Sequence, residues 1–580
     1  MLSVGVLVVG SEGAGARAAI EASKYTDDVM IVTKGKFGQS GATLTAGADI
    51  DVDSASVKRL FNMPGDDRDS PDIFMEDIIK EGKYLNNQSL VEVHVQDAPA
   101  RVKELVDWGM GITFLLHAPG HTYPRGVYTS GKEMVKALKG EVLRRKTIKV
   151  MEHTMVTDLL SREGEVVGVL ALDLFRGEFF PIHARSIVLA TGGGMQVFPV
   201  QTAPEELTGD GQAMAWRAGA HLVDMEMTQF LPCVFISPPM WKGLAFPFML
   251  GPMGGLDTWL LNKYGNRYMK DWDPERMERT TRDVLSRALA TEVMKGRGSP
   301  NGGTWLSLAH LPYNIIDYLA EWYAKPYLKP DWKYKAFDFR ELMDDVKKGY
   351  AIEVGVASHF FMGGIQINPA CETTLPGLYA AGEVAGGTHG ANRLSGNACT
   401  SIVVQGAIAG RVAAERVKKS RVPEPDPVQV KQMVEQWEGP LRNEGGPRPF
   451  EVKKHIQQTA WKKAGVMRSG VLLQEALQEA RRLKDGDLPR LSCGAREREY
   501  NREWIEAIQA WNTTFLLEAI SSCALLREES RGAHNRIDFP KIDNNRWLQN
   551  IHIRNAGGAQ ETYLTPVVKT KVPLPGGEES

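Results

Sequence analysis

The sequence predicts an α/β protein in which a Rossmann-like domain is split by an inserted α+β capping domain and followed by a helical C-terminal domain. Residues 4–34 read as a strand, a glycine turn, an alanine-rich helix and a second strand, the pattern of a βαβ unit. Glycine-rich sequence returns at 363–397 and leads into an apolar helix. The region between them is rich in Trp, Pro and Met. Two separated glycine-rich pieces therefore predict one discontinuous domain.

Changes in composition set the expected domain boundaries. Charged, amphipathic helical sequence follows the linker VPEPDP, Val422 to Pro427. Around 155–191, alternating segments and an REGE turn predict an antiparallel meander before the buried strand SIVLATGGG. The expected parts are the Rossmann-like domain at 1–230 and 353–420, the capping domain at 231–352, the helical domain at 428–555 and a tail at 556–580.

Composition limits the classes of function. The formal net charge of −2 over 580 residues argues against nucleic acid as a partner. Five cysteines without a C-x-x-C pair argue against a bound cluster or structural zinc, and predict reduced thiols in the cytoplasm. The first strand begins within a few residues of Met1, and no apolar run approaches the roughly 20 residues of a membrane span. We therefore expect no metal, no signal peptide and no transmembrane segment, although a partner subunit could hold the chain at a membrane.

The first glycine turn, GSEGAG, departs from the dinucleotide pattern G-x-G-x-x-G at one position. Gly10 and Gly15 occupy the first and last glycine positions, but Glu12 stands at the middle one. A glycine there lets the backbone approach a pyrophosphate closely, whereas a carboxylate adds bulk and negative charge beside two phosphates. This turn alone leaves dinucleotide binding open.

Four ordered stretches carry a resemblance to a known family. They are GSEGAG, LATGGG at 189–194, TGDGQAMAWRAGAHLVDMEMTQF at 208–230, and the long glycine-rich segment from SHFFMGG to VVQGAIAG at 358–410. Together they resemble the flavoprotein subunit of succinate dehydrogenase and fumarate reductase, in a wider family with L-aspartate oxidase and the adenylylsulfate reductase flavoprotein. The resemblance covers most of residues 1–420, and LLREESRGAHNRIDFP at 525–540 extends it into the C-terminal domain.

The resemblance implies an FAD-binding domain. The glycine turn begins a helix, whose free N–H groups and dipole attract a pyrophosphate. By resemblance, Asp210 lies near the FAD-binding segments, Glu383 binds the ribityl chain, and the helix that starts at SGNACTSI faces the pyrimidine side of the flavin. Each segment taken singly could be only a tight turn. The expected cofactor-binding residues are Gly10, Glu12, Gly13, Ala14, Gly15, Thr33, Lys34, Ser40, Gly41, Ala42, Thr45, Ala46, Gly47, Val156, Ala190, Thr191, Gly192, Asp210, Gly382, Glu383, Asn397, Ala398 and Cys399.

The segment KFGQSGATLTAGADI, Lys36 to Ile50, predicts how FAD is held. In the quinone-linked members of the family, the corresponding segment contains a histidine bonded to the flavin. An ungapped alignment on Ser40 and Gly47 puts Gly41 at that position. No other histidine lies nearby in the sequence, so we expect non-covalent FAD and consider succinate oxidation by quinone disfavoured.

Three residues match the family's substrate site. Arg393 in GANRLSGN matches the carboxylate-binding arginine, and a guanidinium suits bidentate carboxylate recognition. His359 matches a substrate histidine, and Arg282 in TTRDVLSRA matches the arginine that protonates the substrate carbon. The loop HTYPRG adds His121 and Arg125 as weaker pocket candidates, for which an exposed loop is the alternative.

Other pocket positions depart from the family. Leu231 stands where QFHPT would place a histidine, and Leu250 and Met253 stand near a relay glutamate and an arginine. Apolar residues there put standard fumarate reduction in doubt. An aromatic and Met-rich cap suits a larger, less polar substrate, although these residues could equally form the core of the cap.

The leading interpretation is an FAD-dependent oxidoreductase that moves a hydride between flavin N5 and a carbon near a carboxylate or carbonyl. Its substrate would be a small carboxylate or thioester, and electrons would pass to or from an iron–sulfur subunit. One alternative is an electron-transfer flavoprotein subunit with an altered substrate site. Another is an enzyme like L-aspartate oxidase or adenylylsulfate reductase. We also hypothesise that Glu12 turns away from the pyrophosphate towards the adenosine ribose, because Thr33 replaces the acid that usually binds it.

Overall fold

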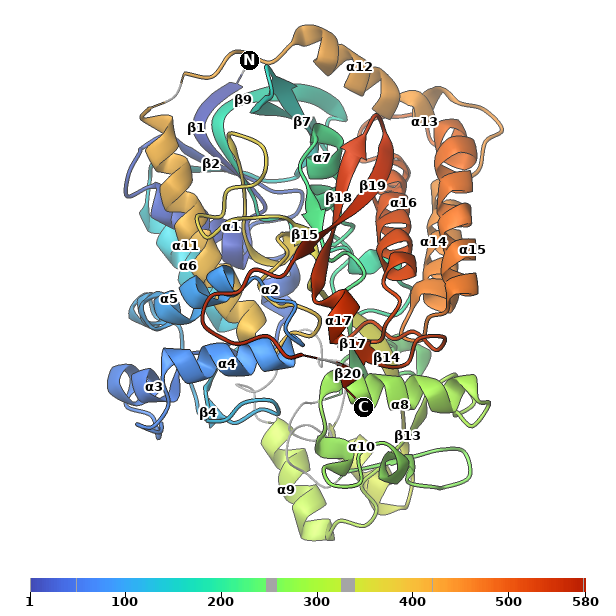
Figure 1. Cartoon of the computed structure of the whole chain (residues 1–580). Coiled ribbons are helices and arrows are strands. Elements are labelled where there is room, and N and C mark those ends of the chain that lie inside the picture. The colour runs from blue at the N-terminus through green and yellow to red at the C-terminus, as the bar shows by residue number, and fades with distance from the viewer. Residues whose placement is uncertain are drawn as a thin grey trace.

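A parallel sheet assembled from distant parts of the chain forms the centre of the Rossmann-like domain (Figure 1). The computed structural model describes residues 2–47, 49–246, 258–324, 339–419, 421–576 and 578–579. The strand order is β6-β2-β1-β9, and β16 pairs with the second half of β9. These parallel strands are β1 (Leu2–Val9), β2 (Val29–Val32), β6 (Ile148–Met151), β9 (Glu178–Leu189) and β16 (Leu378–Ala380).

Helices cover one face of this sheet, and glycines set how closely two of them pack. A Cβ on Gly406 would lie 2.6 Å from the Ala14 carbonyl oxygen, and one on Gly410 would lie 2.1 Å from that of Ala18. Only glycine at both positions allows α11 to lie this close to α1. The covering helices are α1 (Gly13–Ala22), α5 (Gln88–Asp107), α6 (Gly131–Arg144) and α11 (Asn397–Val417).

The predicted meander is confirmed. β7 (Thr154–Arg162) and β8 (Glu165–Asp173) pair antiparallel, and β8 pairs with the first half of β9. The REGE turn has positive φ at both central residues, Glu163 and Gly164, which matches the right-handed twist of a hairpin. Smaller elements between β2 and β6 are α2 (Ala42–Thr45), β3 (Asp49–Asp51), α3 (Ser54–Phe61), α4 (Pro71–Glu81), β4 (Leu115–Leu116) and β5 (Gly126–Tyr128).

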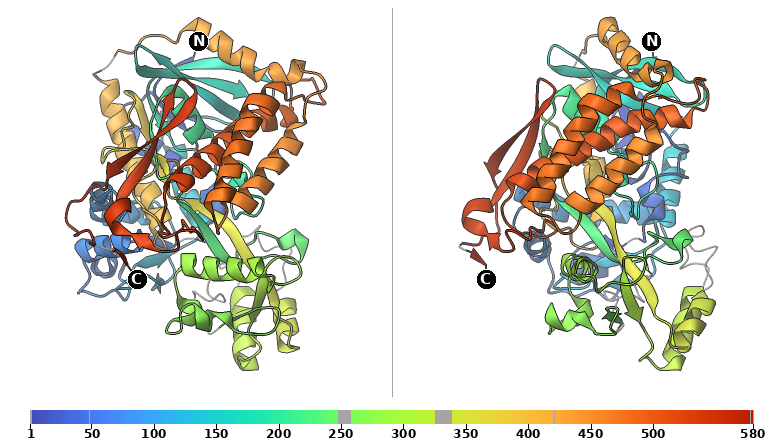
Figure 2. Two further views of the ribbon diagram at one scale, coloured as in Figure 1. Left: turned by 45° about the vertical axis from the view of Figure 1, so that its right-hand side comes forward. Right: turned by 90° about the vertical axis from the view of Figure 1, so that its right-hand side faces the viewer.

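The inserted capping domain is built on its own antiparallel sheet and lies beyond one end of the Rossmann-like domain (Figure 2). The strands that enter and leave this domain pair antiparallel, starting with Thr228 opposite Phe361. The domain therefore begins and ends within a strand pair that also belongs to the larger domain. The predicted limits at 231 and 352 fall within these strands. The sheet runs β11 (Thr228–Phe235), β14 (Ile352–Phe361), β13 (Thr304–Ser307) and β12 (Trp259–Leu261), packed with α8 (Arg282–Met294), α9 (Tyr313–Ala324) and α10 (Phe339–Lys347).

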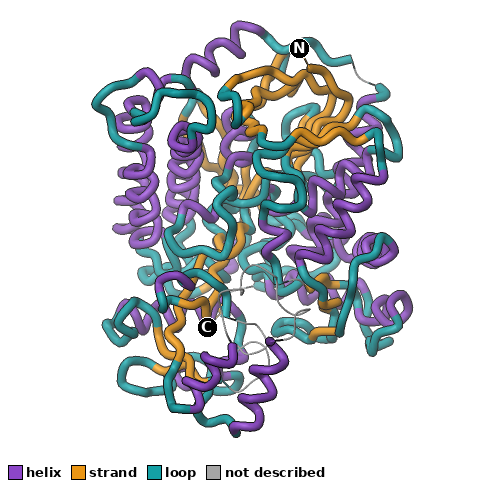
Figure 3. Tube along the Cα trace, turned by 180° about the vertical axis from the view of Figure 1, so that it is seen from behind, coloured by secondary structure: helices purple, strands orange, loops and turns teal. Residues whose placement is uncertain are grey.

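The C-terminal region is mostly helical from Pro427 to Leu526, and the predicted boundary at 556 falls at the turn of a hairpin. A hairpin of β18 (Gln549–Ala556) and β19 (Ala559–Pro566) crosses that boundary, and β18 pairs with β10 (Leu222–Val223). Gln88 then accepts hydrogen bonds from three backbone N–H groups at 570–572, so this part of the expected tail is anchored. The helices, visible from behind in Figure 3, are α12 (Pro427–Trp437), α13 (Gly439–Arg442), α14 (Pro449–Ala464), α15 (Gly470–Arg482), α16 (Arg502–Leu526) and α17 (Asn544–Trp547). None of the helices in the described ranges is both long and apolar enough to span a membrane.

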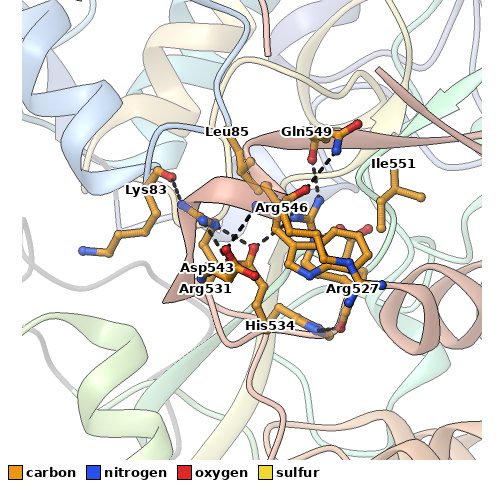
Figure 4. A network of polar contacts seen from close by, with 12 residues as sticks. Lys83, Leu85, Arg527, Arg531, His534, Asp543, Arg546, Gln549 and Ile551 are labelled. Carbon is orange, nitrogen blue, oxygen red and sulfur yellow. Dashed lines mark hydrogen bonds and ion pairs between the residues drawn. The ribbon is translucent and has the colours of Figure 1, made fainter. Parts of the chain in front are cut away.

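A buried ionic network joins the C-terminal region to the Rossmann-like domain (Figure 4). Arg527 donates to Glu226 at 2.7 Å and pairs with Glu529 at 3.1 Å, and all three side chains are fully buried. Arg531 pairs with the same Glu529 and donates to the Lys83 carbonyl. Breaking one partner of such a cluster leaves a charge buried without compensation.

We predict that Arg527→Ala lowers the free energy of unfolding by about 3–5 kcal/mol, because Glu226 would lose its buried cation. Arg546→Ala is the matched control, since Arg546 pairs with Glu528 on the exposed side of the same region and should change stability by less than about 0.5 kcal/mol. Urea denaturation followed by tryptophan fluorescence measures both. Equal effects of the two substitutions would contradict a stabilising role for the buried network.

Candidate active site

A cavity lies at the carboxyl edge of the parallel sheet, where ligands bind in open α/β folds. It encloses about 900 Å³, including space open to solvent. Four strands deliver residues to it directly: Gly10 follows β1, Thr33 follows β2, Ala190 follows β9 and Ala381 follows β16. The order of the strands therefore brings four distant segments of the sequence to one place.

Most of the predicted cofactor residues line this cavity. They are Gly10, Glu12, Gly13, Ala14, Thr33, Lys34, Ser40, Gly41, Ala42, Val156, Ala190, Thr191, Gly192, Asp210, Gly382 and Glu383. The lining residues do not include Gly15, Thr45, Ala46, Gly47, Asn397, Ala398 or Cys399. Further lining residues that were not predicted include Ser11, Thr43, Glu206, Met214 and Ile402, and all but Glu206 lie inside the stretches quoted above.

The glycine turn is built for close packing at both ends. Gly10 has φ +104°, and a Cβ there would lie 2.2 Å from the Ala190 carbonyl oxygen. A Cβ on Gly15 would lie 1.9 Å from the Gly10 carbonyl oxygen, so Gly15 shapes the turn without facing the cavity. Helix α1 begins at Gly13 and directs its N-terminus into the cavity. This end of the helix is suited to bind phosphate.

Glu12, which caps α1 and lines the cavity, lies against Gly41. A Cβ on Gly41 would meet Glu12 Cγ at 2.2 Å, so the two positions are fitted to each other. The pKa of Glu12 is raised to about 8. Burial is the main cause and the charge of Glu206 adds to it, while the Leu44 N–H and Lys139 act in the opposite direction. A carboxyl group with that pKa is largely protonated at neutral pH, which removes the charge that would repel two phosphates. Its contact with a ribose stays a prediction.

Two buried polar contacts shape the floor of the cavity. Lys34 forms an ion pair with Asp210 at 2.6 Å, and Asn512 of α16 donates to the same carboxylate at 2.9 Å. Glu383 accepts from the Phe361 N–H at 2.9 Å, and burial raises its pKa to about 7. The C-terminal helix and the second strand of the cap therefore both hold cavity residues in place.

Arg393 and Arg282 lie close together beyond the cavity. Arg393 is 5% exposed, its guanidinium lies over the Phe360 ring, and its Nε makes no hydrogen bond in the described parts of the chain. Arg282 donates from Nη2 to Ser395 Oγ at 2.9 Å, whereas its buried Nη1 has no partner among the residues described. Burial and the charge of Arg282 lower the pKa of Arg393 to about 10. Two cations with unused donors form a site for an anion.

His359 lies on β14 and Leu231 lies on β11, the two paired strands that connect the cap to the rest of the chain. Thr202 Oγ1 and His359 Nδ1 are 2.8 Å apart, which orients the ring. Leu231 pairs with Ala357 in the register and packs in a small apolar cluster that includes Val200. The side chain at 231 is therefore core, and Leu250 and Met253 lie outside the described residues.

His121 and Arg125 are buried, so the alternative of an exposed loop is wrong. Arg125 forms ion pairs with Asp69 and Asp77 at 2.7 and 2.5 Å, and its charge is compensated there. His121 Nε2 lies 3.2 Å from the Ser395 carbonyl oxygen, and burial lowers its pKa to about 3. His121 thus supports the loop that carries Ser395, and Arg125 lies beside His121.

Comparison with known proteins decides the family. The family described as FAD binding domain matches residues 5–399, and the family described as fumarate reductase flavoprotein C-term matches 453–578. The chain belongs to the fumarate reductase flavoprotein family. The fumarate reductase (CoM/CoB) of Methanothermobacter marburgensis has a subunit that is 35% identical over 92% of this chain and 94% of its own length. L-aspartate oxidase of a Nostoc strain is 29% identical over 81% and 82%.

The fold agrees with a solved member of this family. A quinol fumarate reductase flavoprotein of E. coli superposes with a TM-score of 0.86 at 26% identity, covering 99% of both chains. This flavoprotein is thus an FAD-dependent oxidoreductase. The cavity suits FAD, because it offers a helix N-terminus for phosphate and a buried Thr191 hydroxyl without a partner in the described structure. Its lining, as far as the chain is described, includes no histidine.

We predict that FAD is held without a covalent bond, because glycine occupies position 41 and no histidine is among the described lining residues. Precipitation of the yellow protein with acid should release all flavin to the supernatant. Flavin that remains in the washed pellet would contradict this.

We predict that FAD binding weakens as the pH rises above about 8. Phosphate beside Glu12 raises the carboxyl pKa further, so above pH 8 binding must take up a proton. The dissociation constant should be flat near pH 7 and rise by up to about tenfold per pH unit above about 8. In Glu12→Gln this rise should disappear. An unchanged slope in Glu12→Gln, measured by flavin fluorescence, would show that another group titrates.

Proposed function

We propose that this flavoprotein is a catalytic subunit that transfers a hydride between flavin N5 and a carbon α or β to a carboxylate or carbonyl. The observation that carries the proposal is the pair Arg393 and Arg282, two enclosed guanidiniums that form no ion pair with a carboxylate in the described structure. Keeping two like charges close together costs free energy unless an anion binds between them. A substrate carboxylate supplies that anion.

Arg393, His359 and Arg282 would each act on a different part of the substrate. Arg393 binds the carboxylate through its free Nε, and the Phe360 ring beneath it fixes the guanidinium plane. His359, oriented by Thr202, donates or accepts at the other side of the substrate. Arg282 holds the proton exchanged with the substrate carbon. Bound FAD supplies or accepts the hydride.

The direction that we favour is reduction of an unsaturated acid with a less polar body than fumarate. Leu231 stands where the family resemblance places a histidine that would bind a second carboxylate, and it packs in an apolar cluster. The substrate site would therefore have one charged end, at the arginines, and one apolar end. Electrons would arrive from an iron–sulfur subunit, because relatives of this chain are named as subunits of complexes and its own cysteines form no cluster motif.

A second candidate is an electron-transfer subunit whose substrate site has been altered. The apolar surroundings of Leu231 favour it, since a vestigial site would lose polar groups first. The two candidates differ in whether a small molecule can reoxidise the reduced protein without a partner.

We predict that at least one compound in a panel of fumarate, larger enoates, enoyl thioesters and adenylylsulfate reoxidises the dithionite-reduced holoprotein. Arg393→Ala should slow that reaction by about 100-fold or more, because the developing negative charge loses a fixed donor. Arg411→Ala, at an exposed position on α11 outside the site, is the control and should be unchanged. Stopped-flow absorbance of the flavin gives the rates. Failure of the whole panel, with electron flow unaffected by Arg393→Ala, would favour the electron-transfer subunit.

A further inference from the structure

A chain of hydrogen bonds leads from Arg282 towards the surface. Arg282 Nη2 donates to Ser395 Oγ at 2.9 Å, and the Ser395 hydroxyl donates to Asp49 Oδ2 at 3.1 Å. The three residues come from α8 of the cap, the loop before α11, and β3. Two consecutive hydrogen bonds therefore join three separate parts of the fold.

The two ends of this line differ in their surroundings. At the inner end, Arg282 Nη1 is buried and has no hydrogen-bond partner within the described ranges. At the other end, Asp49 is half-buried, so the residue is partly accessible to solvent. Its negative charge acts on both Arg282 and Arg393 and opposes the lowering of their pKa by burial. The charged and titratable groups that face Asp49 are Asp51, Tyr128, Arg282, Arg393 and Cys399.

An arginine that gives a proton to carbon must regain one before the next turnover. The pKa of free arginine exceeds about 12, so the group works as a donor only beside a base or acid that reloads it. The segment 241–255 contains no acidic residue that could do this. Asp49 is the carboxylate connected to Arg282 by hydrogen bonds through a single hydroxyl.

We propose that Asp49 and Ser395 form the proton path that reloads Arg282, a role that rests on the proposed hydride transfer. In the reducing direction, the substrate gains a hydride at one carbon and a proton from Arg282 at the next. The neutral arginine then accepts the Ser395 proton, while the Asp49 carboxylate takes a proton from water and passes it on to Ser395. One solvent proton enters for each proton delivered, so no further reactant is needed.

A neighbouring acid offers the competing path. Burial raises the pKa of Glu81 to about 7, and its charge acts on Arg282. Glu81 accepts a hydrogen bond from Asn392 at 2.6 Å, and no hydrogen bond joins Glu81 to Arg282 in the part of the chain that the structure describes. Glu81→Gln therefore serves as the comparison that separates the two routes.

The test measures reoxidation of the dithionite-reduced holoprotein by fumarate, mesaconate or cinnamate, with the acid that reacts fastest with the wild type. Asp49→Asn and Ser395→Ala should each lower the limiting rate by about 100-fold. The concentration of acid at half-maximal rate should not rise in Asp49→Asn, because removing a negative charge near two arginines does not weaken anion binding. Ser395→Thr, which keeps a hydroxyl, should recover most of the rate. Asp67→Asn, at an exposed site, is the matched control.

A second readout separates misfolding from loss of the proton path. Malonate should perturb the spectrum of the oxidised flavin in Asp49→Asn at the same or lower concentration than in the wild type, which shows an intact anion site. Rates of Asp49→Asn and Ser395→Ala within twofold of the wild type would overturn this proposal and leave the proposed function standing. Loss of rate in Glu81→Gln alone would assign the path to Glu81. A wild-type protein that neither these three acids nor the wider panel of enoates, enoyl thioesters and adenylylsulfate reoxidises would overturn both proposals.

Discussion

Two neighbouring arginines that form no ion pair with a carboxylate in the described structure are the constraint on which the rest of the site depends. Arg393 lies buried over Phe360, and Arg282 reaches it from the cap, so the charge of one lowers the pKa of the other. Such a pair is unfavourable in the empty protein and becomes favourable when an anion binds. The fold must hold both guanidiniums in place, and the cap must stay seated for Arg282 to take part.

Packing around α11 provides that support. Glycines at 406 and 410 bring α11 against α1, which fixes the loop carrying Arg393 at the carboxyl edge of the sheet. Ser286 Oγ on α8 donates to the Phe230 carbonyl, and the cap hairpin continues from the FAD-binding domain. From the other side, Asn512 of the C-terminal helix holds Asp210 in the FAD cavity. All three parts of the chain thus meet at the cofactor and substrate sites.

The sequence predicted the parts of this site that lie in glycine turns at strand ends. Gly10, Ala190 and Gly382 were found because close backbone approach requires glycine or alanine at fixed spacing. Contacts between distant segments were not predictable, because no local pattern encodes them. Two such contacts are the packing of Glu12 against Gly41 and the hydrogen bonds that join Arg282 to Asp49 through Ser395. The β18–β19 hairpin was missed as well, since exposed alternating residues after a helical region read as a tail.

The most direct test of the account is an equilibrium titration of the oxidised holoprotein with malonate, a carboxylate that cannot be reduced, followed by the flavin spectrum. The account predicts saturable binding that weakens at least about tenfold in both Arg393→Ala and Arg282→Ala, because each guanidinium contributes one charge to the same anion site. It also predicts less than additive losses in the double variant, since the two residues share one ligand. Malonate that fails to bind, or binds equally well to all variants, would contradict the central claim.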